Sequence, residues 1–193
     1  MRNKIAVFAS GTGSNFDAIT EAVDEGILDA EVSLLVTDKV GAGVIEKAQK
    51  RNIDTVVYTP KTFTNKAAYE AAVLKDCQAR DIEWIILAGY MRLIGPTLLQ
   101  SYSGRIVNIH PSLLPAFPGK DAIGQAIDKK VKVTGVTIHF VDDGMDTGPI
   151  IAQEAISITE NDTKDEVRQK VQSVEHRLYP RVIQSLLTKE EAK

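Results

Sequence analysis

Asn108 and His110 lie two residues apart in the segment RIVNIHP, which is typical of a short strand that runs into a proline turn. Residues two apart on a strand point to the same side, so the amide and the imidazole are expected to face together. The later segment VDDGMDTGP carries Asp142, Asp143 and Asp146. A carboxylate beside His110 would raise the imidazole pKa and make it a general acid near physiological pH. With an amide N–H for an oxyanion, such a trio could promote addition of a nucleophile to a carbonyl.

A glycine-rich turn, ASGTGSN, follows the first apolar run. Its backbone N–H groups can converge on an anion, and the N-terminus of a following helix would add partial positive charge, which suits a phosphate. Ser14 and Asn15 can cap that helix and donate to the same anion. The dinucleotide-binding fingerprint G-x-G-x-x-G matches at Gly11 and Gly13, but Phe16 occupies the position of its third glycine. The turn is not a Walker motif either, because no Gly-Lys-Ser/Thr follows. The pattern favours a monophosphate site; an ordinary tight turn with a helix cap is the alternative.

The other histidines and the cysteine carry less chemistry. His139 lies in the strand pattern VTIHFV and His176 in a helical pattern, and we expect both to be structural. Neither has a partner at the spacing of a metal site, and there is no cysteine cluster, so no metal site is predicted. Cys77 lies in the helical segment AAVLKDCQAR, where we expect a buried thiol rather than a nucleophile.

Apolar, β-branched runs alternate with helical patterns, which predicts an α/β fold with a mostly parallel sheet flanked by helices. His110 would then end a strand, where such folds place their ligands. We expect strands at Lys4–Ala9, Val32–Thr37, Asp54–Tyr58, Trp84–Ala88, Arg105–Ile109, Gly135–Val141 and Pro149–Ile158. We expect helices at Asn15–Glu25, about Val44–Arg51, Lys66–Arg80 and a long amphipathic one from Thr163 to about Leu187.

Composition limits the class of protein. A chain of 193 residues favours one domain over 1–193, and 44% apolar with 25% charged residues is an ordinary globular balance. A net charge of −3 gives no general attraction to nucleic acid or anionic lipid, so neither is an expected partner. No apolar run approaches the roughly 18 residues of a membrane span, and the start is too short for a signal peptide. With a single cysteine, we expect a cytoplasmic protein.

Four segments are similar to one enzyme family: FASGTGSN, LAGYMRLIGP, NIHPSLLPAFPG and HFVDDGMDTGPIIAQ. They resemble the phosphoribosylglycinamide formyltransferases, folate-dependent enzymes of purine biosynthesis, from Lys4 to about Ile183. HPSLLP with a later D-x-G-P also resembles the wider group that uses 10-formyltetrahydrofolate, including the methionyl-tRNA formyltransferase and formyltetrahydrofolate hydrolase. The glycine turn near the N-terminus narrows the resemblance to the enzymes that formylate glycinamide ribonucleotide.

The resemblance implies a Rossmann-like formyltransferase fold with a long C-terminal helix. It implies a phosphate-binding half over about 1–105 and a catalytic and folate half over about 106–193. It further implies 10-formyltetrahydrofolate as co-substrate, no metal, small-molecule substrates, and a monomer or homodimer.

Roles follow residue by residue from the same resemblance. The implied catalytic residues are Asn108, His110 and Asp146. The implied phosphoribosyl contacts are Gly13, Ser14, Asn15, Gln172 and Glu175. The implied folate contacts are Lys66, Met91, Arg92, Leu93, Ile94, Asn108, Val141, Asp142, Asp143, Gly144 and Asp146. Leu114–Pro115 corresponds to a cis peptide in the family. Where some members have a histidine after FPG, this chain has Asp121, so the role of that histidine does not transfer.

The implied reaction is direct attack of the substrate amine on the formyl carbon. His110 would be the general acid, Asn108 the oxyanion donor, and Asp146 the carboxylate that raises the pKa of His110. Two alternative functions each leave part of the candidate site without a role. Hydrolysis of the formyl folate leaves the phosphate turn without a role, and a nucleotide-binding module leaves Asn108, His110 and Asp146 without one.

Overall fold

The computed structural model describes residues 2–191. The strands in that range are β1 (Asn3–Phe8), β2 (Ala30–Thr37), β3 (Thr55–Val57), β4 (Trp84–Leu87), β5 (Ile106–His110), β6 (Val133–Phe140) and β7 (Ile150–Ser157). They form one sheet in the order β3-β2-β1-β4-β5-β6-β7. Neighbours from β3 to β5 pair in parallel, whereas β6 pairs antiparallel with β5 and β7. The predicted α/β class and mostly parallel sheet are confirmed.

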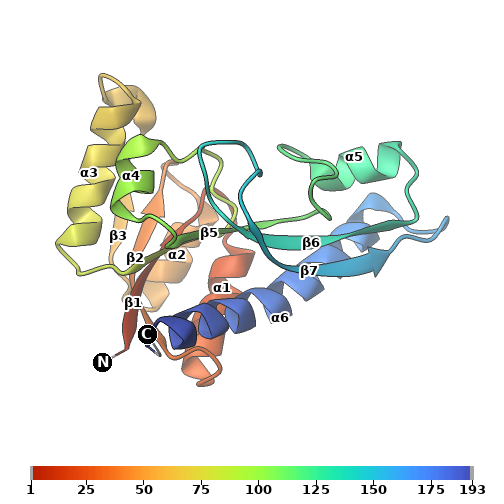
Figure 1. Ribbon diagram of the computed structural model, residues 1–193, viewed down its shortest axis with the longest axis horizontal. Coiled ribbons are helices and arrows are strands. Elements are labelled where there is room, and N and C mark those ends of the chain that lie inside the picture. The colour runs from red at the N-terminus through yellow and green to blue at the C-terminus, as the bar shows by residue number, and fades with distance from the viewer. Residues whose placement is uncertain (1, 192–193) are drawn as a thin grey trace.

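Helices cover both faces of this sheet (Figure 1). One face is covered by α3 (Lys66–Gln78) and α4 (Pro96–Ser101), and the other by α1 (Ser14–Asp24), α2 (Gly43–Lys50) and α6 (Lys164–Glu191). A short 3-10 helix, Pro60–Thr62, precedes α3. The helix α5 (Ala122–Asp128) packs at one end of α6, which then passes β6, β7 and α1. The predicted long C-terminal helix is confirmed.

The strand β1 shows why its sequence is almost wholly apolar. Ile5 and Val7 belong to the core beneath α1, α2 and α6, while Ala6 and Phe8 belong to the core beneath α3 and α4. Successive side chains on a strand point to opposite faces, so a strand between two helix layers needs an apolar residue at every position. All four side chains are fully buried.

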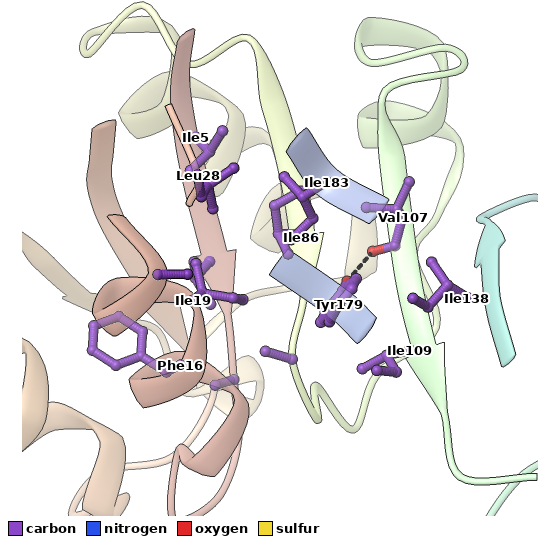
Figure 2. Close-up of a cluster of buried hydrophobic side chains, with 14 of the residues drawn as sticks. Ile5, Phe16, Ile19, Leu28, Ile86, Val107, Ile109, Ile138, Tyr179 and Ile183 are labelled. Carbon is purple, nitrogen blue, oxygen red and sulfur yellow. Dashed lines mark hydrogen bonds between the residues drawn. The ribbon is translucent and has the colours of Figure 1, made fainter. Parts of the chain in front are cut away.

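One polar atom lies deep in the first of these cores. The side chain of Tyr179 on α6 is fully buried among apolar residues, as Figure 2 shows. Its hydroxyl donates to the carbonyl oxygens of Leu87 at 2.9 Å and Val107 at 3.1 Å. These carbonyls belong to the neighbouring strands β4 and β5, so Tyr179 joins α6 to the strand that ends at His110.

The structure differs from the predicted elements at several points. The short helix α5 was not expected; Asp121 begins it in the left-handed conformation, and its carboxylate accepts from the Gly124 N–H at 3.2 Å. Such a short helix with a glycine has little helical periodicity, so its cap and packing decide it. The strand β6 starts two residues before the expected Gly135. The Leu114–Pro115 peptide is cis, as the resemblance implied.

The buried hydroxyl gives a test of the packing beneath β4 and β5. We expect Tyr179→Phe to lower the free energy of unfolding by about 1–3 kcal/mol, because two carbonyl oxygens lose a donor in a site that water does not reach. Urea unfolding followed by circular dichroism measures this loss. Tyr58→Phe is the matched control, because Tyr58 is only partly buried and its hydroxyl bonds to Asp76 at 2.6 Å. An equal loss in both variants would contradict the role given to Tyr179.

Candidate active site

The pairing of β5 with β6 assembles the first part of the site. Asn108 and His110 are two residues apart on β5, so their side chains lie on the same face of the sheet. The antiparallel register places His139 directly opposite Asn108, and Thr137 directly opposite His110. Side chains of directly opposed residues lie on the same face, so four polar residues gather at this point of the sheet. The expectation that Asn108 and His110 face together agrees with this arrangement.

The loop between β6 and β7 brings Asp146 to this face. Its Oδ2 lies 3.4 Å from His110 Nδ1, and its Oδ1 lies 3.4 Å from Asn108 Nδ2. Asp146 has a left-handed backbone, with φ 57°. The loop folds back tightly, because a Cβ at Gly148 would lie 1.9 Å from the Phe140 carbonyl oxygen. Only glycine fits there, so the spacing of D-x-G is a steric requirement of the turn.

The Asp146 carboxylate is nearly buried and still holds its charge. Burial raises its pKa, but the neighbouring His139, the Gly119 N–H and the charge of His110 lower it by more, so the net shift is downward. The Gly119 N–H donates to Oδ2 at 2.7 Å. Asp146 is therefore a fixed negative charge in the cluster at neutral pH.

Both ring nitrogens of His110 face acceptors. The Nε2 lies 2.8 Å from the carbonyl oxygen of Phe117, and Nδ1 faces the Asp146 carboxylate. A carbonyl oxygen only accepts, so Nε2 carries a proton in this contact. With the Asp146 carboxylate at the other nitrogen, the ring is held between two acceptors. Phe117 lies in the proline-rich segment after β5 and has φ 56°, which turns its carbonyl toward the ring.

His139 lies within this cluster, although the sequence analysis assigned it a structural role. Its Nε2 is 3.1 Å from Asn108 Nδ2 and 3.6 Å from Asp146 Oδ1. Its Nδ1 donates to the Phe140 carbonyl at 2.8 Å, which fixes the ring. His139 thus orients the Asn108 amide from the neighbouring strand. The sequence placed it in a strand pattern and at the start of the segment HFVDDGMDTGPIIAQ. Neither signal showed that it lies opposite Asn108, because strand register cannot be derived from the sequence.

The glycine turn is tight, which agrees with both an anion site and an ordinary turn. Gly13 has φ 78°, and a Cβ there would lie 2.6 Å from Val44 Cγ2, so the turn packs directly against α2. Ser14 begins α1, one residue earlier than expected, and no side chain caps the helix. The predicted cap at Ser14 or Asn15 is wrong, because the Asn15 amide turns instead toward α6 and donates to Glu175 at 3.1 Å. The backbone N–H groups of the turn are thereby left without a side-chain acceptor at the helix start.

Glu175 is an almost completely buried carboxyl group on α6. Burial raises its pKa to about 7, although the hydrogen bond from Asn15 lowers it. The Asn15 Oδ1 has no partner among the described residues, so the pair presents an unsatisfied acceptor beside a titratable group. Both side chains line the large cavity described below. Gln172, one turn earlier on α6, lies instead in a shallow surface hollow with Gln169 and Ser173.

A cavity of about 550 Å³ is lined by the polar cluster around Asp146 and by Asn15 and Glu175. The catalytic candidates lie along its wall, with Asn15 and Glu175 at one part and the segment Tyr90–Ile94 at another. Of the expected folate contacts, those on this wall are Met91, Arg92, Leu93, Ile94, Asn108, Val141, Asp142, Gly144 and Asp146. Asp143 is exposed and does not line it. Lys66 lines an adjoining cavity of about 450 Å³, which Met91–Ile94 also line.

Two further features bear on the class of site. Within residues 2–191, no group of three or more histidine, cysteine, aspartate or glutamate side chains has the arrangement of a metal site. In the same range, no helix combines the length and apolar character that crossing a membrane requires.

Comparison with known proteins places this geometry in a family. The formyl transferase family model matches residues 3–183. The chain is 56% identical to phosphoribosylglycinamide formyltransferase of Bacillus subtilis over 184 residues, which cover 95% of this chain and 94% of the relative. The crystal structure of phosphoribosylglycinamide formyltransferase from Bacillus halodurans is 56% identical, with a TM-score of 0.95 and 97% coverage of both chains. Glycinamide ribonucleotide transformylase 1 from Geobacillus kaustophilus is 55% identical, with a TM-score of 0.94 and coverage of 97% and 100%.

Glu175→Gln tests the burial of this carboxyl group. Its pKa of about 7 lies above the ordinary 4.5, so folding favours the protonated form. Stability is then lost as the pH rises through this window, and the cost at about pH 8 is on the order of 3 kcal/mol. We expect Glu175→Gln to exceed the unaltered chain in urea stability at about pH 8, with the difference shrinking toward about pH 5. The exposed Glu25→Gln is the control, and a difference independent of pH would contradict the burial of Glu175.

Proposed function

The chain belongs to the formyl transferase family, and we propose that it transfers a formyl group from 10-formyltetrahydrofolate to the amine of 5-phosphoribosylglycinamide in purine biosynthesis. The observation that carries this proposal is the convergence of Asn108, His110 and Asp146 on one wall of a cavity. The same cavity is lined by Asn15, which ends the phosphate turn, by its partner Glu175, and by the segment Tyr90–Ile94.

The reaction needs an oxyanion to be stabilised and a proton to be moved. The substrate amine attacks the formyl carbon, the C–N bond forms, and the carbonyl oxygen becomes negatively charged. Asn108 and His110 are the donors assigned to this oxygen, because both side chains line the cavity wall. Preorganised donors of this kind are worth about 10²–10³ in rate each. The intermediate collapses when its bond to the folate N10 breaks, and the proton that the amine loses goes to N10.

The contact between His110 and Phe117 suggests how the acid is used. The Nε2 proton points at the Phe117 carbonyl oxygen in this structure, 2.8 Å away. We propose that the oxyanion replaces this carbonyl as the acceptor when substrate is bound. Asp146 stays at Nδ1 as the charged partner of the ring. His139 Nε2 holds one N–H of the Asn108 amide at 3.1 Å, and the other N–H exchanges its long 3.4 Å contact with Asp146 for the oxyanion. No covalent intermediate is required, since both substrates can be held in register in one cavity.

The two substrates have different subsites in this proposal. The turn Gly13–Asn15 and Glu175 hold the phosphoribosyl part, where backbone N–H groups at a helix start favour a phosphate. The segment Met91–Ile94 and the loop 141–146 hold the folate. Half-exposed apolar side chains there, Met91 at 61% and Leu93 at 48%, suit a flat ring system. These are small-molecule partners, and we propose that they are met in the cytoplasm.

A two-substrate assay tests the proposed function. The purified chain is mixed with 5-phosphoribosylglycinamide and 10-formyltetrahydrofolate, and deformylation is followed by absorbance. We expect turnover only when both substrates are present, because the amine is the attacking group. Deformylation without the amine would indicate a hydrolase. No deformylation in any mixture would contradict catalysis altogether and leave the phosphate turn as a binding site.

Variants of the catalytic cluster test the assigned roles. We expect His110→Ala and Asp146→Asn each to lower kcat by about 10²–10⁴, because the first removes the acid and the second its stabilising charge. The KM of each substrate should change little, since neither side chain supplies most of the binding surface. Steady-state kinetics with each substrate varied in turn measures this. Asp128→Asn, an exposed carboxylate at the end of α5, serves as the control. Near-native turnover in either variant would refute the role of that residue.

A further inference from the structure

Asp38 is a buried carboxylate that the proposed mechanism does not use. It directly follows β2, and its side chain is 6% exposed. One carboxylate oxygen accepts from the Ser10 hydroxyl at 2.5 Å, and the other from Arg92 Nε at 3.0 Å. A buried carboxylate is stable only when such donors surround it, so these two partners are a requirement of the fold at this point.

Ser10 extends this contact to a third segment. Its hydroxyl oxygen accepts from the Met91 N–H at 2.9 Å while its hydrogen is given to Asp38. Its own backbone N–H donates to the Gly89 carbonyl at 3.2 Å. Ser10 directly precedes the glycine turn, and Met91 begins the segment assigned to the folate. Two hydrogen bonds therefore join Ser10 directly to the chain at Gly89 and Met91, and a third joins it to Asp38.

The sheet order explains why these residues meet. The strand β1 lies between β2 and β4, and all three run parallel, so their carboxyl ends lie side by side. Ser10, Asp38 and Gly89 each follow one of these ends. The chain from Gly89 to Gly95 forms neither helix nor strand, so side-chain contacts must hold it in place. Gly89 has φ 77°, which turns the segment away from the strand direction.

We infer that Asp38 is a positioning residue for the folate subsite, which it holds through Arg92 and through Ser10 on the phosphate turn. This inference rests on the proposed function and goes beyond it, because Asp38 lines neither cavity and reaches the folate subsite only through Arg92 and Ser10. Arg92, expected as a folate contact, has its Nε occupied by Asp38 while its side chain is 42% exposed on the cavity side. The orientation of the guanidinium and of the Met91 backbone thus depends on one buried charge.

Asp38→Asn is the direct test. Asparagine retains an oxygen for Ser10 but loses the charge that faces Arg92. We expect the KM for 10-formyltetrahydrofolate to rise about 10-fold or more, as for the loss of a hydrogen bond to a charged group. kcat and the KM for 5-phosphoribosylglycinamide should stay within about twofold of the unaltered chain by the same reasoning. Asp54→Asn is the control, because its pairing with Arg80 at 3.1 Å is exposed and remote from the cavity.

A double-mutant cycle separates positioning from a general loss of structure. We expect Arg92→Gln alone to raise the KM for the folate. It should add little when Asp38 is already asparagine, because the two residues act as one unit. Additive effects would mean that Arg92 works without Asp38, and they would overturn the inference. If thermal denaturation shows that Asp38→Asn is not folded, Ser10→Ala is tested in its place. We expect the same selective rise in the folate KM.

Binding measurements distinguish failure of this inference from failure of the proposed function. Calorimetry with tetrahydrofolate, which has no formyl group to transfer, gives a Kd without turnover. We expect Asp38→Asn to weaken this Kd by the same factor as the KM. If the unaltered chain is active and Asp38→Asn leaves both folate constants unchanged, or raises the KM of both substrates equally, the inference is wrong and the function stands. If the unaltered chain neither turns over nor binds tetrahydrofolate, the function fails and the inference with it.

Discussion

The site depends on one buried negative charge. The Asp146 carboxylate lies 3.4 Å from both His110 and Asn108 and accepts the Gly119 N–H at 2.7 Å. A buried carboxylate without donors would be expensive, so β5, β6 and the proline-rich segment must all deliver polar hydrogens to this point. The arrangement that stabilises the carboxylate is the same one that orients the imidazole and the amide. The geometry of the proposed catalytic cluster and its local folding stability are therefore two consequences of one electrostatic constraint.

The sheet supplies the rigid frame for this cluster. Apolar side chains on both faces of β1 and the hydroxyl of Tyr179 fix β4 and β5 against the helices. The segments that follow the strand ends are irregular. Their backbone polar groups are not satisfied by the regular hydrogen bonds of a sheet. After β1, β2 and β4, hydrogen bonds among Ser10, Asp38 and the segment that begins at Gly89 hold the chain in place instead. The two proposed subsites, which lie at neighbouring strand ends, can thus be held in a constant relation without a domain interface.

The sequence predicted part of the site for clear physical reasons. Asn108 and His110 were placed together because the two-residue period of a strand depends on nothing beyond the strand itself. His139 was taken as structural, although it lies opposite Asn108, because register depends on which strands pair. The helix cap expected at Ser14 or Asn15 was wrong, because the Asn15 amide bonds to Glu175 on a helix 160 residues later in the chain. Five residues assigned to subsites do not line the main cavity: Gly13, Ser14, Lys66, Asp143 and Gln172.

Local rules thus determined the alternation of strands and helices, the glycine turn and the pairing of Asn108 with His110. Each depends on backbone sterics, periodicity or burial along a short stretch of chain. Only the tertiary structure decided which carboxylate approaches His110, where His139 lies, and that Asp38 joins the phosphate turn to Arg92. These contacts join residues 28 to 54 positions apart. Their distances are set by strand order and register, which arise when the whole sheet packs between its helices.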